Sequence, residues 1–389
     1  MIKTGLRNLL SDPPAVVRGK RIGVLVNPAS VDERFNGTAE LLATRFPGKL
    51  AAVFTPQHGL FAAKQDNMIE SGHGVHETLK VPVYSLYSET RVPTPEMMDG
   101  MDVLLVDIQD VGTRVYTFIY TVSYCMEAAG RLGKPVVILD RPNPIGKGIE
   151  GNLLDPAFSS FVGRFPLPMR HGMTVGELCR MFAGSFGVSC ELSVVPMSGY
   201  SPGSYYERTG LPWVLPSPNL PTVSSSVVYP GQVLWEGTNV SEARGTTVPF
   251  EMFGAPYLDM DAVMADLSGP EIPGAVLRPC GFEPTSNKHA GTLCKGFFLH
   301  VTDRRRFQPV RTSLALLASI FKRHPGLFAW KNPPYEYEFE RLPIDLILGS
   351  DRFRKALEAG EDFAFMEKWL AGDEKEFAKL RKPYLLYGE

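Results

Sequence analysis

From Arg21 onward, short apolar runs rich in β-branched residues alternate with stretches of helical character, and this alternation constrains the fold more than any other feature. The expected strands cover residues 22–26, 50–54, 81–86, 103–108, 135–139 and 191–195. The expected helices lie near residues 37–45, 95–98, 116–132 and 175–186. Such alternation is typical of a mostly parallel sheet, and the nearly continuous apolar strands indicate that helices cover both of its faces.

The alternation stops after about residue 225, which predicts two domains, residues 1–225 and 226–389. A chain of 389 residues accommodates two domains of ordinary size. In the second domain we expect strands at residues 231–235, 275–277 and 297–301 and helices at residues 310–323, 351–359, 362–371 and 374–380. The expectation is therefore an α/β domain followed by a smaller α+β domain, with the proline-rich residues 211–230 between them.

The charges are almost balanced, with 40 Lys and Arg against 42 Asp and Glu, which argues against nucleic acid as a partner. The longest uncharged run, residues 209–235, contains five prolines and cannot form a membrane-spanning helix. Charged residues near the N-terminus interrupt any apolar core of an export signal. Five cysteines without a CxxC pair are typical of reduced thiols, so we expect a soluble, cytoplasmic protein without a membrane partner.

Polar loops follow five of the expected strands at their carboxyl ends. Their sequences are Asn27-Pro-Ala-Ser30, Thr55-Pro-Gln-His-Gly59, Ser85-Leu-Tyr-Ser-Glu89, Gln109-Asp-Val-Gly-Thr-Arg114 and Asp140-Arg-Pro-Asn-Pro144. In open α/β sheets, ligands bind in the crevice beyond the carboxyl ends of the strands. We therefore expect these loops to meet in one binding site.

Several common catalytic and cofactor motifs are absent or incomplete. No glycine-rich dinucleotide or Walker motif follows the first strand, so no nucleotide cofactor is expected. The segment Gly199-Tyr-Ser-Pro-Gly203 has the spacing of a serine nucleophile elbow, but Pro202 lacks the backbone N–H that would help to bind the oxyanion. His73 and His76 are not accompanied by an HExxH motif, so no metal is expected either.

Acidic and basic side chains gather in the strand-end loops, where burial is costly unless the charges pair with each other or bind a polar ligand. The residues concerned are Asp107, Asp110, Arg114, Asp140, Arg141 and Asn143. Tyr116, Tyr120 and Trp213 would suit the apolar face of a sugar ring, whose hydroxyls need such polar partners. The pattern favours a carbohydrate-like ligand, and a purely structural ion-pair network is the alternative.

The second domain repeats this chemistry in two glycine-containing loops. Glu236-Gly-Thr-Asn239 and Glu242-Ala-Arg-Gly-Thr246 place carboxylates beside turns. Facing the crevice of the sheet, they would form the opposite wall of a cleft. His58 follows the second strand and His171 precedes a helix, and both positions suit hydrogen bonding or proton transfer better than metal ligation.

These motifs, together with others along the chain, carry a resemblance to a known family. They are Val26-Asn-Pro-Ala-Ser30, Thr55-Pro-Gln-His-Gly59, Val83-Tyr-Ser-Leu-Tyr87, Pro93-Thr-Pro-Glu96, Asp107-Ile-Gln-Asp-Val-Gly-Thr-Arg114, Leu139-Asp-Arg-Pro-Asn-Pro144, Glu150-Gly151, Arg170-His-Gly-Met-Thr174, Pro216-Ser-Pro-Asn-Leu-Pro221 and Glu236-Gly-Thr-Asn-Val-Ser241. In these segments the sequence resembles the exo-β-N-acetylmuramidase family, long catalogued as a domain of unknown function in bacteria. The resemblance runs from the first strand well into the second domain.

The resemblance implies a glycoside hydrolase that removes N-acetylmuramic acid from the non-reducing end of peptidoglycan fragments, either MurNAc-GlcNAc or muropeptides. It implies a Rossmann-like first domain, with helices on both faces of a mostly parallel sheet, a smaller second domain and a cleft between them. Such hydrolysis normally uses two carboxyl groups, one protonating the leaving oxygen and the other acting as base or nucleophile. No metal or cofactor is then required, and the missing export signal fits the recycling of imported wall sugars.

The candidate catalytic residues are Glu70, Asp110, Glu150, Glu236 and His58. The candidate substrate-binding residues are Asn27, Gln57, Gln109, Arg114, Tyr116, Asp140, Arg141, Asn143, Arg170, His171, Asn219, Asn239 and Arg244. The lactyl carboxylate of muramic acid needs a cationic partner, for which Arg114, Arg141 and Arg170 are the candidates. The choice between acid and base among the carboxyl groups stays open, as does the oligomeric state.

One position departs from the family pattern. Many family members have Glu where this chain has Gln57, and an amide can neither donate a proton as an acid nor act as a carboxylate. If that position is catalytic in the family, this chain is inactive or uses a neighbour such as Glu70. The alternatives are therefore a non-catalytic protein that binds muramyl sugars, or an unrelated hydrolase such as a deacetylase or amidase, which would need a metal or a nucleophile.

Overall fold

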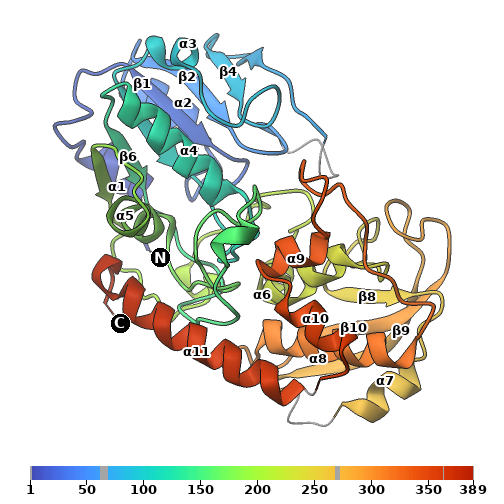
Figure 1. Ribbon diagram of the computed structural model, residues 1–389. Coiled ribbons are helices and arrows are strands. Elements are labelled where there is room, and N and C mark those ends of the chain that lie inside the picture. Colours follow the sequence, from blue (N-terminus) through green and yellow to red (C-terminus); the bar gives the residue numbers. More distant parts are fainter. Residues whose placement is uncertain (1, 62–68, 268–271, 362, 389) are drawn as a thin grey trace.

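The computed structural model describes residues 2–61, 69–267, 272–361 and 363–388. One part of the molecule is built on a seven-stranded sheet and the other on a three-stranded antiparallel sheet (Figure 1). The large sheet has the strand order β3-β4-β2-β1-β5-β6-β7, and its neighbouring strands are parallel except for β3 with β4. The predicted fold class, a mostly parallel α/β domain with a smaller second domain, is confirmed.

The strands are β1 (Ile22–Val26), β2 (Leu50–Thr55), β3 (Gly74–Val75), β4 (Pro82–Ser85), β5 (Val103–Asp107), β6 (Val136–Leu139), β7 (Leu192–Val195), β8 (Met252–Ala255), β9 (Ala275–Phe282) and β10 (Cys294–Val301). The α-helices are α1 (Gly5–Ser11), α2 (Thr38–Arg45), α3 (Pro95–Asp99), α4 (Phe118–Arg131), α5 (Val175–Ser185), α6 (Val223–Gln232), α7 (Met260–Asp266), α8 (Pro309–Arg323), α9 (Pro343–Leu348), α10 (Arg352–Glu358) and α11 (Phe363–Arg381). The strands predicted for the large sheet are all present, within one residue of each expected end.

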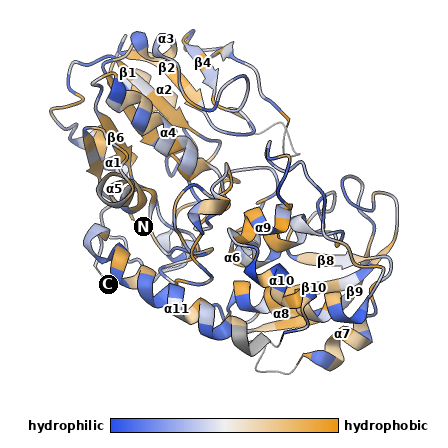
Figure 2. Cartoon of the chain, in the orientation of Figure 1, coloured by the Kyte–Doolittle hydropathy of each residue, from blue (hydrophilic) through white to orange (hydrophobic). Residues whose placement is uncertain are grey.

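Side chains on both faces of the large sheet are buried, because helices cover each face. Val24 and Leu105 belong to a core shared with α1 and α2, whereas Leu25 and Leu104 point the other way into a core shared with α4 and α5. Figure 2 shows strands β1, β2 and β6 largely in the hydrophobic colours. A strand that is buried on both faces needs apolar residues at successive positions. The strands of the large sheet could therefore be predicted from continuous apolar runs in the sequence.

In the second domain, β8, β10 and β9 form the small sheet in that order, and α6 packs against α8. Two predictions are wrong here. Residues 231–235 end α6 and enter a 3-10 helix (Val233–Gly237) instead of forming a strand, because a short buried apolar run has the same pattern in both states. Residues 362–371 and 374–380 were expected as two helices, but the described residues 363–381 form the single helix α11 through Gly372.

The last helix links the second domain back to the first. α11 starts beside the small-sheet domain, and its end lies near α5 (Figure 1). Arg381 Nη1 donates hydrogen bonds to the carbonyl oxygens of Lys147, His171 and Gly172, at 2.9–3.1 Å. The domains are therefore joined at their far end as well as through residues 211–222. None of the described helices combines the length and the apolar character that a bilayer-spanning segment needs.

Candidate active site

A pocket lies between the two domains, beyond the carboxyl end of β2. The first domain contributes residues 57–58 and 115–118, the linker contributes residues 217–220, and the second domain contributes the 3-10 helix and the loop between α8 and α9. The pocket is narrow, with a cavity volume of about 40 Å³, and it is partly open to solvent.

Glu236 lies in the wall formed by the second domain and is almost fully buried. Its Oε1 accepts a hydrogen bond from Arg244 Nη2 at 2.6 Å, and its Oε2 accepts one from the Tyr335 hydroxyl at 2.6 Å. Burial by itself raises the pKa of Glu236, but the Arg244 guanidinium and the Tyr335 hydroxyl bring that pKa below its ordinary value. Glu236 is therefore a carboxylate at neutral pH.

Glu336 lies in the same pocket, on the loop between α8 and α9. The Tyr87 hydroxyl donates to its Oε2 at 2.6 Å, and Gln57 Nε2 donates to its Oε1 at 3.3 Å. Burial raises the pKa of Glu336 above its ordinary value, and the charge of Glu236 adds to the rise. The two hydrogen bonds and the charge of Arg91 only partly oppose it. The pocket thus contains two carboxyl groups whose proton affinities are shifted in opposite directions.

Gln57 connects the two domains across the pocket. Its amide nitrogen donates to Glu336, and its Oε1 accepts a hydrogen bond from Thr117 Oγ1 at 3.1 Å. His58, the next residue, lines the pocket with a φ of 75°, a left-handed conformation that is uncommon for residues other than glycine. The amide at position 57 therefore holds a carboxyl group in place instead of supplying one.

Three tyrosines give the pocket aromatic walls. The Tyr116 and Tyr229 rings meet edge to face, with their centroids 6.2 Å apart, and Tyr335 faces the same space. Burial raises the pKa of all three phenols, so they remain neutral. Together with Asn219 and Ser217, they offer both apolar surface and hydrogen-bonding groups, which is the combination that a sugar ring requires.

Several residues predicted from the sequence do line this pocket. They are Gln57, His58, Tyr116, Asn219, Glu236 and Arg244. Glu70 is not among the residues that line the pocket. It is exposed to solvent, with the Tyr337 hydroxyl 3.4 Å from its Oε1. The structure therefore brings together groups from the loop after β2, the start of α4, the linker and the second domain.

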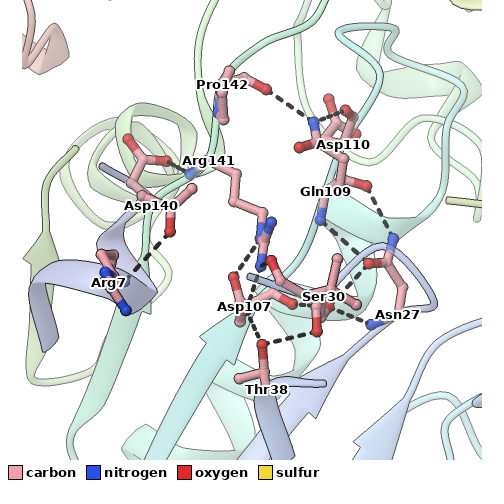
Figure 3. Close-up of polar contacts among 12 residues, drawn as sticks. Arg7, Asn27, Ser30, Thr38, Asp107, Gln109, Asp110, Asp140, Arg141 and Pro142 are labelled. Carbon is pink, nitrogen blue, oxygen red and sulfur yellow. Dashed lines mark hydrogen bonds and ion pairs between the residues drawn. The ribbon is translucent and has the colours of Figure 1, made fainter. Parts of the chain in front are cut away.

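Asp107 and Arg141 form a buried ion pair outside the pocket. Arg141 donates from Nε and Nη2 to the two Asp107 oxygens, at 2.6 and 2.8 Å, and the Thr38 hydroxyl also donates to Asp107 (Figure 3). The guanidinium of Arg141 is thus already matched by a protein carboxylate. This pair therefore belongs to a structural ion-pair network, the alternative to ligand binding that the sequence left open for these residues.

Asn27 and Gln109 belong to the same buried network (Figure 3). Asn27 Nδ2 donates to the Gln109 carbonyl at 3.0 Å, and Gln109 Nε2 donates to the Pro142 carbonyl at 2.9 Å. These bonds connect the loops that follow β1, β5 and β6. Both side chains position the loops and lie outside the pocket.

Arg114 is fully buried and is also committed to the fold. Its two terminal nitrogens donate to four backbone carbonyls, those of Asn152, Leu167, Ile347 and Leu348, at 2.7–3.0 Å. Burial lowers the pKa of Arg114 to about 10. The structure therefore gives this cation partners from both domains and does not place it where a substrate carboxylate would bind.

Asp140 and Asn143 fix the region before α5. Asp140 Oδ2 accepts hydrogen bonds from the Thr174 hydroxyl at 2.7 Å and the Tyr387 hydroxyl at 2.6 Å. Burial raises the pKa of Asp140 to about 6. Asn143 Nδ2 donates to the Met173 carbonyl at 3.0 Å. Both residues hold the start of α5 and the C-terminal tail instead of the pocket wall.

Asp110, Arg170 and His171 form a buried layer behind the pocket. His171 Nε2 lies 3.6 Å from Asp110 Oδ2, and the charge of Asp110 contributes to the raised pKa of Tyr116. Arg170 donates to the Tyr205 hydroxyl at 3.3 Å and to a backbone carbonyl. These side chains support the wall from behind and do not line the pocket.

Glu150 and Asn239 also lie outside the pocket. Glu150 is buried at the domain interface, where its Oε1 accepts a hydrogen bond from the Arg311 backbone N–H at 2.9 Å. Burial raises the pKa of Glu150 to about 7. Asn239 accepts from the Tyr257 hydroxyl at 2.6 Å and donates to the Leu327 carbonyl at 2.8 Å, so its amide holds a loop of the second domain.

The predicted site residues Asp110, Arg141 and Glu150 therefore do not line one common pocket. The sequence analysis also did not identify Glu336, which does line it. Glu336 belongs to the segment Pro333-Pro-Tyr-Glu-Tyr337, which has neither helical nor strand periodicity. A carboxylate between two tyrosines in a proline-containing loop is the signal that would have found it. Arg141 and Glu150 are instead matched by partners that sequence spacing does not reveal.

The described ranges contain no group of three His, Cys, Asp or Glu side chains arranged to hold a metal ion. His73 Nδ1 accepts a hydrogen bond from the Ser85 N–H at 3.1 Å. His76 Nε2 lies 3.1 Å from the Glu40 carboxylate. Each of these neighbouring histidines therefore has its own protein partner.

Two carboxyl groups in one pocket lined by tyrosines are an arrangement that glycoside hydrolases use. The family model described as Exo-beta-N-acetylmuramidase NamZ, N-terminal, matches residues 22–224, and the corresponding C-terminal model matches residues 227–387. The chain therefore belongs to the exo-β-N-acetylmuramidase family, which is a family of glycoside hydrolases.

Individual relatives agree with this assignment. The chain is 42% identical over 388 residues to a Bacillus subtilis (strain 168) protein named peptidoglycan beta-N-acetylmuramidase NamZ, covering 99% of this chain and 91% of that protein. Two crystal structures of DUF1343 family proteins from Bacteroides fragilis NCTC 9343 are also similar. One has a TM-score of 0.88 with 31% identity, covering 99% of both chains, and the other has a TM-score of 0.76 with 28% identity, covering 100% of this chain and 99% of its own.

Proposed function

We propose that this chain is an exo-acting β-N-acetylmuramidase that releases N-acetylmuramic acid from the non-reducing end of peptidoglycan fragments. The observation that carries the proposal is the pair Glu236 and Glu336, whose surroundings shift their pKa values in opposite directions within one pocket. Family membership and the printed name of the Bacillus subtilis relative support the substrate class.

Glu336 is the general acid in this proposal. Burial keeps its carboxyl group protonated to a higher pH than that of an ordinary glutamate, so it has a proton to give to the leaving glycosidic oxygen. Glu236, kept ionised by Arg244, is the base or the nucleophile at the anomeric carbon. The aromatic walls and the amide and imidazole groups of the pocket hold the sugar between the two carboxyl groups.

Glu236→Gln and Glu336→Gln, assayed on the MurNAc-GlcNAc disaccharide, test this assignment. We expect the wild-type protein to release N-acetylmuramic acid and each variant to lose about 10²–10⁴-fold in kcat, because each lacks one of the two carboxyl groups. Glu127→Gln is the control, since Glu127 pairs with Arg164 away from the pocket. No release by the wild-type protein, under conditions where a control muramidase is active, would refute the function.

Glu70 is the competing acid, because its carboxyl group is exposed and lies 3.4 Å from the hydroxyl of Tyr337, the chain neighbour of Glu336. Glu70→Gln distinguishes the two assignments in the same assay. With Glu336 as the acid, Glu70→Gln keeps most of its turnover. An inactive Glu70→Gln together with an active Glu336→Gln would move the acid role to Glu70.

The two alternatives give different outcomes. A non-catalytic binder would bind muramyl ligands in calorimetry without turnover, whereas a deacetylase or amidase would release acetate or peptide instead of a sugar. We favour the glycosidase because the pocket holds two carboxyl groups. A cytoplasmic location, independence of metal and a role in recycling wall fragments stay predictions from the sequence.

A further inference from the structure

Arg91 is held in an aromatic cage whose residues Phe161 and Tyr337 are the chain neighbours of Val162 and Glu336, which line the pocket. Its guanidinium carbon lies 4.2 Å from the centre of the Tyr337 ring, 4.5 Å from that of Phe161 and 5.3 Å from that of Tyr87. These contacts fix the plane of the guanidinium without neutralising its charge. Across the part of the chain that the structure describes, no carboxylate ion-pairs with Arg91, and its Nε is buried without a hydrogen-bond partner.

The cage connects Arg91 to both candidate acids. Tyr87 donates to Glu336 at 2.6 Å, and the Tyr337 hydroxyl lies 3.4 Å from Glu70 Oε1. The rings of Tyr87 and Tyr337 meet edge to face, with their centroids 6.1 Å apart. The cation is thus one aromatic ring away from the carboxyl groups of the pocket and on the same side as the loop that carries Glu336.

The arginines that the sequence suggested for an anionic substrate group are committed elsewhere. Arg141 pairs with Asp107, and Arg114 donates to four carbonyls. Arg170 donates to the Ile145 carbonyl and to the Tyr205 hydroxyl. Within the pocket, Arg244 pairs with Glu236 and lies 3.3 Å from Glu242. Arg91 differs from these arginines because, among the residues that the structure describes, neither a carboxylate nor a backbone carbonyl pairs with its guanidinium, and its Nε is buried without a hydrogen-bond partner.

We propose that Arg91 binds the lactyl carboxylate of N-acetylmuramic acid and so selects this sugar over N-acetylglucosamine. The inference rests on the proposed function and names the residue that gives the pocket its preference. A planar guanidinium can donate two parallel N–H bonds to a carboxylate, and stacking on aromatic rings orients it in advance. N-acetylglucosamine lacks the lactyl ether and would leave this charge unmatched.

The test compares two chromogenic substrates, the 4-nitrophenyl β-glycosides of N-acetylmuramic acid and N-acetylglucosamine, and adds the lactyl methyl ester of the first. For Arg91→Gln we expect kcat/KM on the muramic acid substrate to fall by about 10- to 100-fold, since a charge-assisted hydrogen bond is lost. The rates on the methyl ester and on the N-acetylglucosamine substrate change little. If Arg91 instead binds a carboxylate of the stem peptide, Arg91→Gln lowers kcat/KM on muropeptides alone.

Lys331→Gln is the matched control, because Lys331 is another cation stacked on an aromatic ring near the pocket, 5.7 Å from the centre of Tyr335. If Arg91 acts through a specific contact, Lys331→Gln leaves the ratio of kcat/KM on the N-acetylmuramic acid and N-acetylglucosamine substrates unchanged. Arg91→Lys keeps the charge but loses the planar fork, and we expect an intermediate loss on the lactyl substrate. This variant decides the question if Arg91→Gln does not fold.

An unchanged ratio of the two sugar rates in a folded Arg91→Gln, or a loss confined to muropeptides, would overturn the Arg91 assignment while leaving the muramidase function intact. A wild-type protein that cleaves neither sugar would overturn the proposed function, and the Arg91 assignment with it. Melting temperatures measured beside the rates confirm that each variant is folded.

Discussion

At the scale of single residues, the site is shaped by which carboxyl group is in direct contact with a cation. Glu236 accepts a hydrogen bond from Arg244, whereas among the described residues Glu336 accepts hydrogen bonds from the neutral groups of Tyr87 and Gln57, and Arg91 acts on it through its charge. The first arrangement favours the ionised form, and in the second burial favours the protonated form. The difference allows one pocket to hold a base and an acid at the same pH.

Tyr87→Phe should shift the basic limb of the pH–rate profile upward. The Tyr87 hydroxyl donates to Glu336 and lowers its pKa, so removing the hydroxyl raises the pKa further and keeps the acid protonated to a higher pH. The measurement is kcat/KM against pH for both proteins. Tyr120→Phe, which removes a buried hydroxyl bonded to the Arg114 carbonyl, is the control and should leave that limb in place.

Sequence reasoning found part of this site because polar loops at strand ends are visible in a chain. Gln57 and Glu236 stand in such loops, and both line the pocket. The sequence analysis did not identify Glu336 and Arg91, because both lie in irregular segments. In such segments the sequence has no periodicity that indicates which side chains face a pocket. Arg114 was misplaced for a different reason. Its partners are backbone carbonyls, which every residue has, so the sequence does not indicate which of them bind Arg114.

At the scale of secondary structure, two helical glycines have opposite consequences. Gly231 lies where α6 meets α8, and a Cβ there would stand 1.9 Å from the Pro309 carbonyl oxygen. Gly372 lies within α11, and a Cβ there would meet no neighbour within 4 Å. One glycine therefore permits close packing of two helices, while the other only loosens its own helix.

Alanine substitutions should separate these two roles. We expect Gly231→Ala to lower the free energy of unfolding by about 2 kcal/mol or more, because backbone atoms must move apart. Gly372→Ala should raise it by about 0.5–1 kcal/mol, since alanine favours the helix and nothing obstructs it. Denaturant unfolding followed by circular dichroism measures both. Equal destabilisation by the two substitutions would contradict the packing argument.

The large sheet was predictable element by element because both of its faces are buried, which makes its strands continuous apolar runs. The second domain was harder to predict. Its run at residues 231–235 has the composition of a strand but is helical, because α6 continues into it and packs against α8. Residues 362–371 and 374–380 were predicted as two helices, whereas residues 363–381 form one helix that continues through Gly372.

At the scale of the whole molecule, the domain interface contains a buried titratable group. Glu150, from the first domain, faces Arg311 and Glu374 from the second and Arg170 from its own. Burial raises the pKa of Glu150 from 4.5 to about 7. The folded protein therefore holds a proton that the unfolded chain has lost between those pH values, and the stability of the wild-type protein falls as pH rises through this window.

Glu150→Gln should remove this pH dependence. The amide keeps an oxygen for the Arg311 N–H but has no proton to lose, so the variant should match the wild-type stability near pH 5. At pH 8 it should exceed the wild-type free energy of unfolding by up to about 3 kcal/mol. Urea unfolding at the two pH values measures the difference. A variant that is less stable at pH 8 would show that ionised Glu150 supports the interface instead.

The four carbonyls around Arg114 come in equal numbers from the two halves of the chain. Neither half, produced alone, could satisfy that guanidinium or bury its own share of the acceptors. Separating the two halves would therefore leave Arg114 without two of its four acceptors, and exchanging either half requires replacement acceptors for this guanidinium.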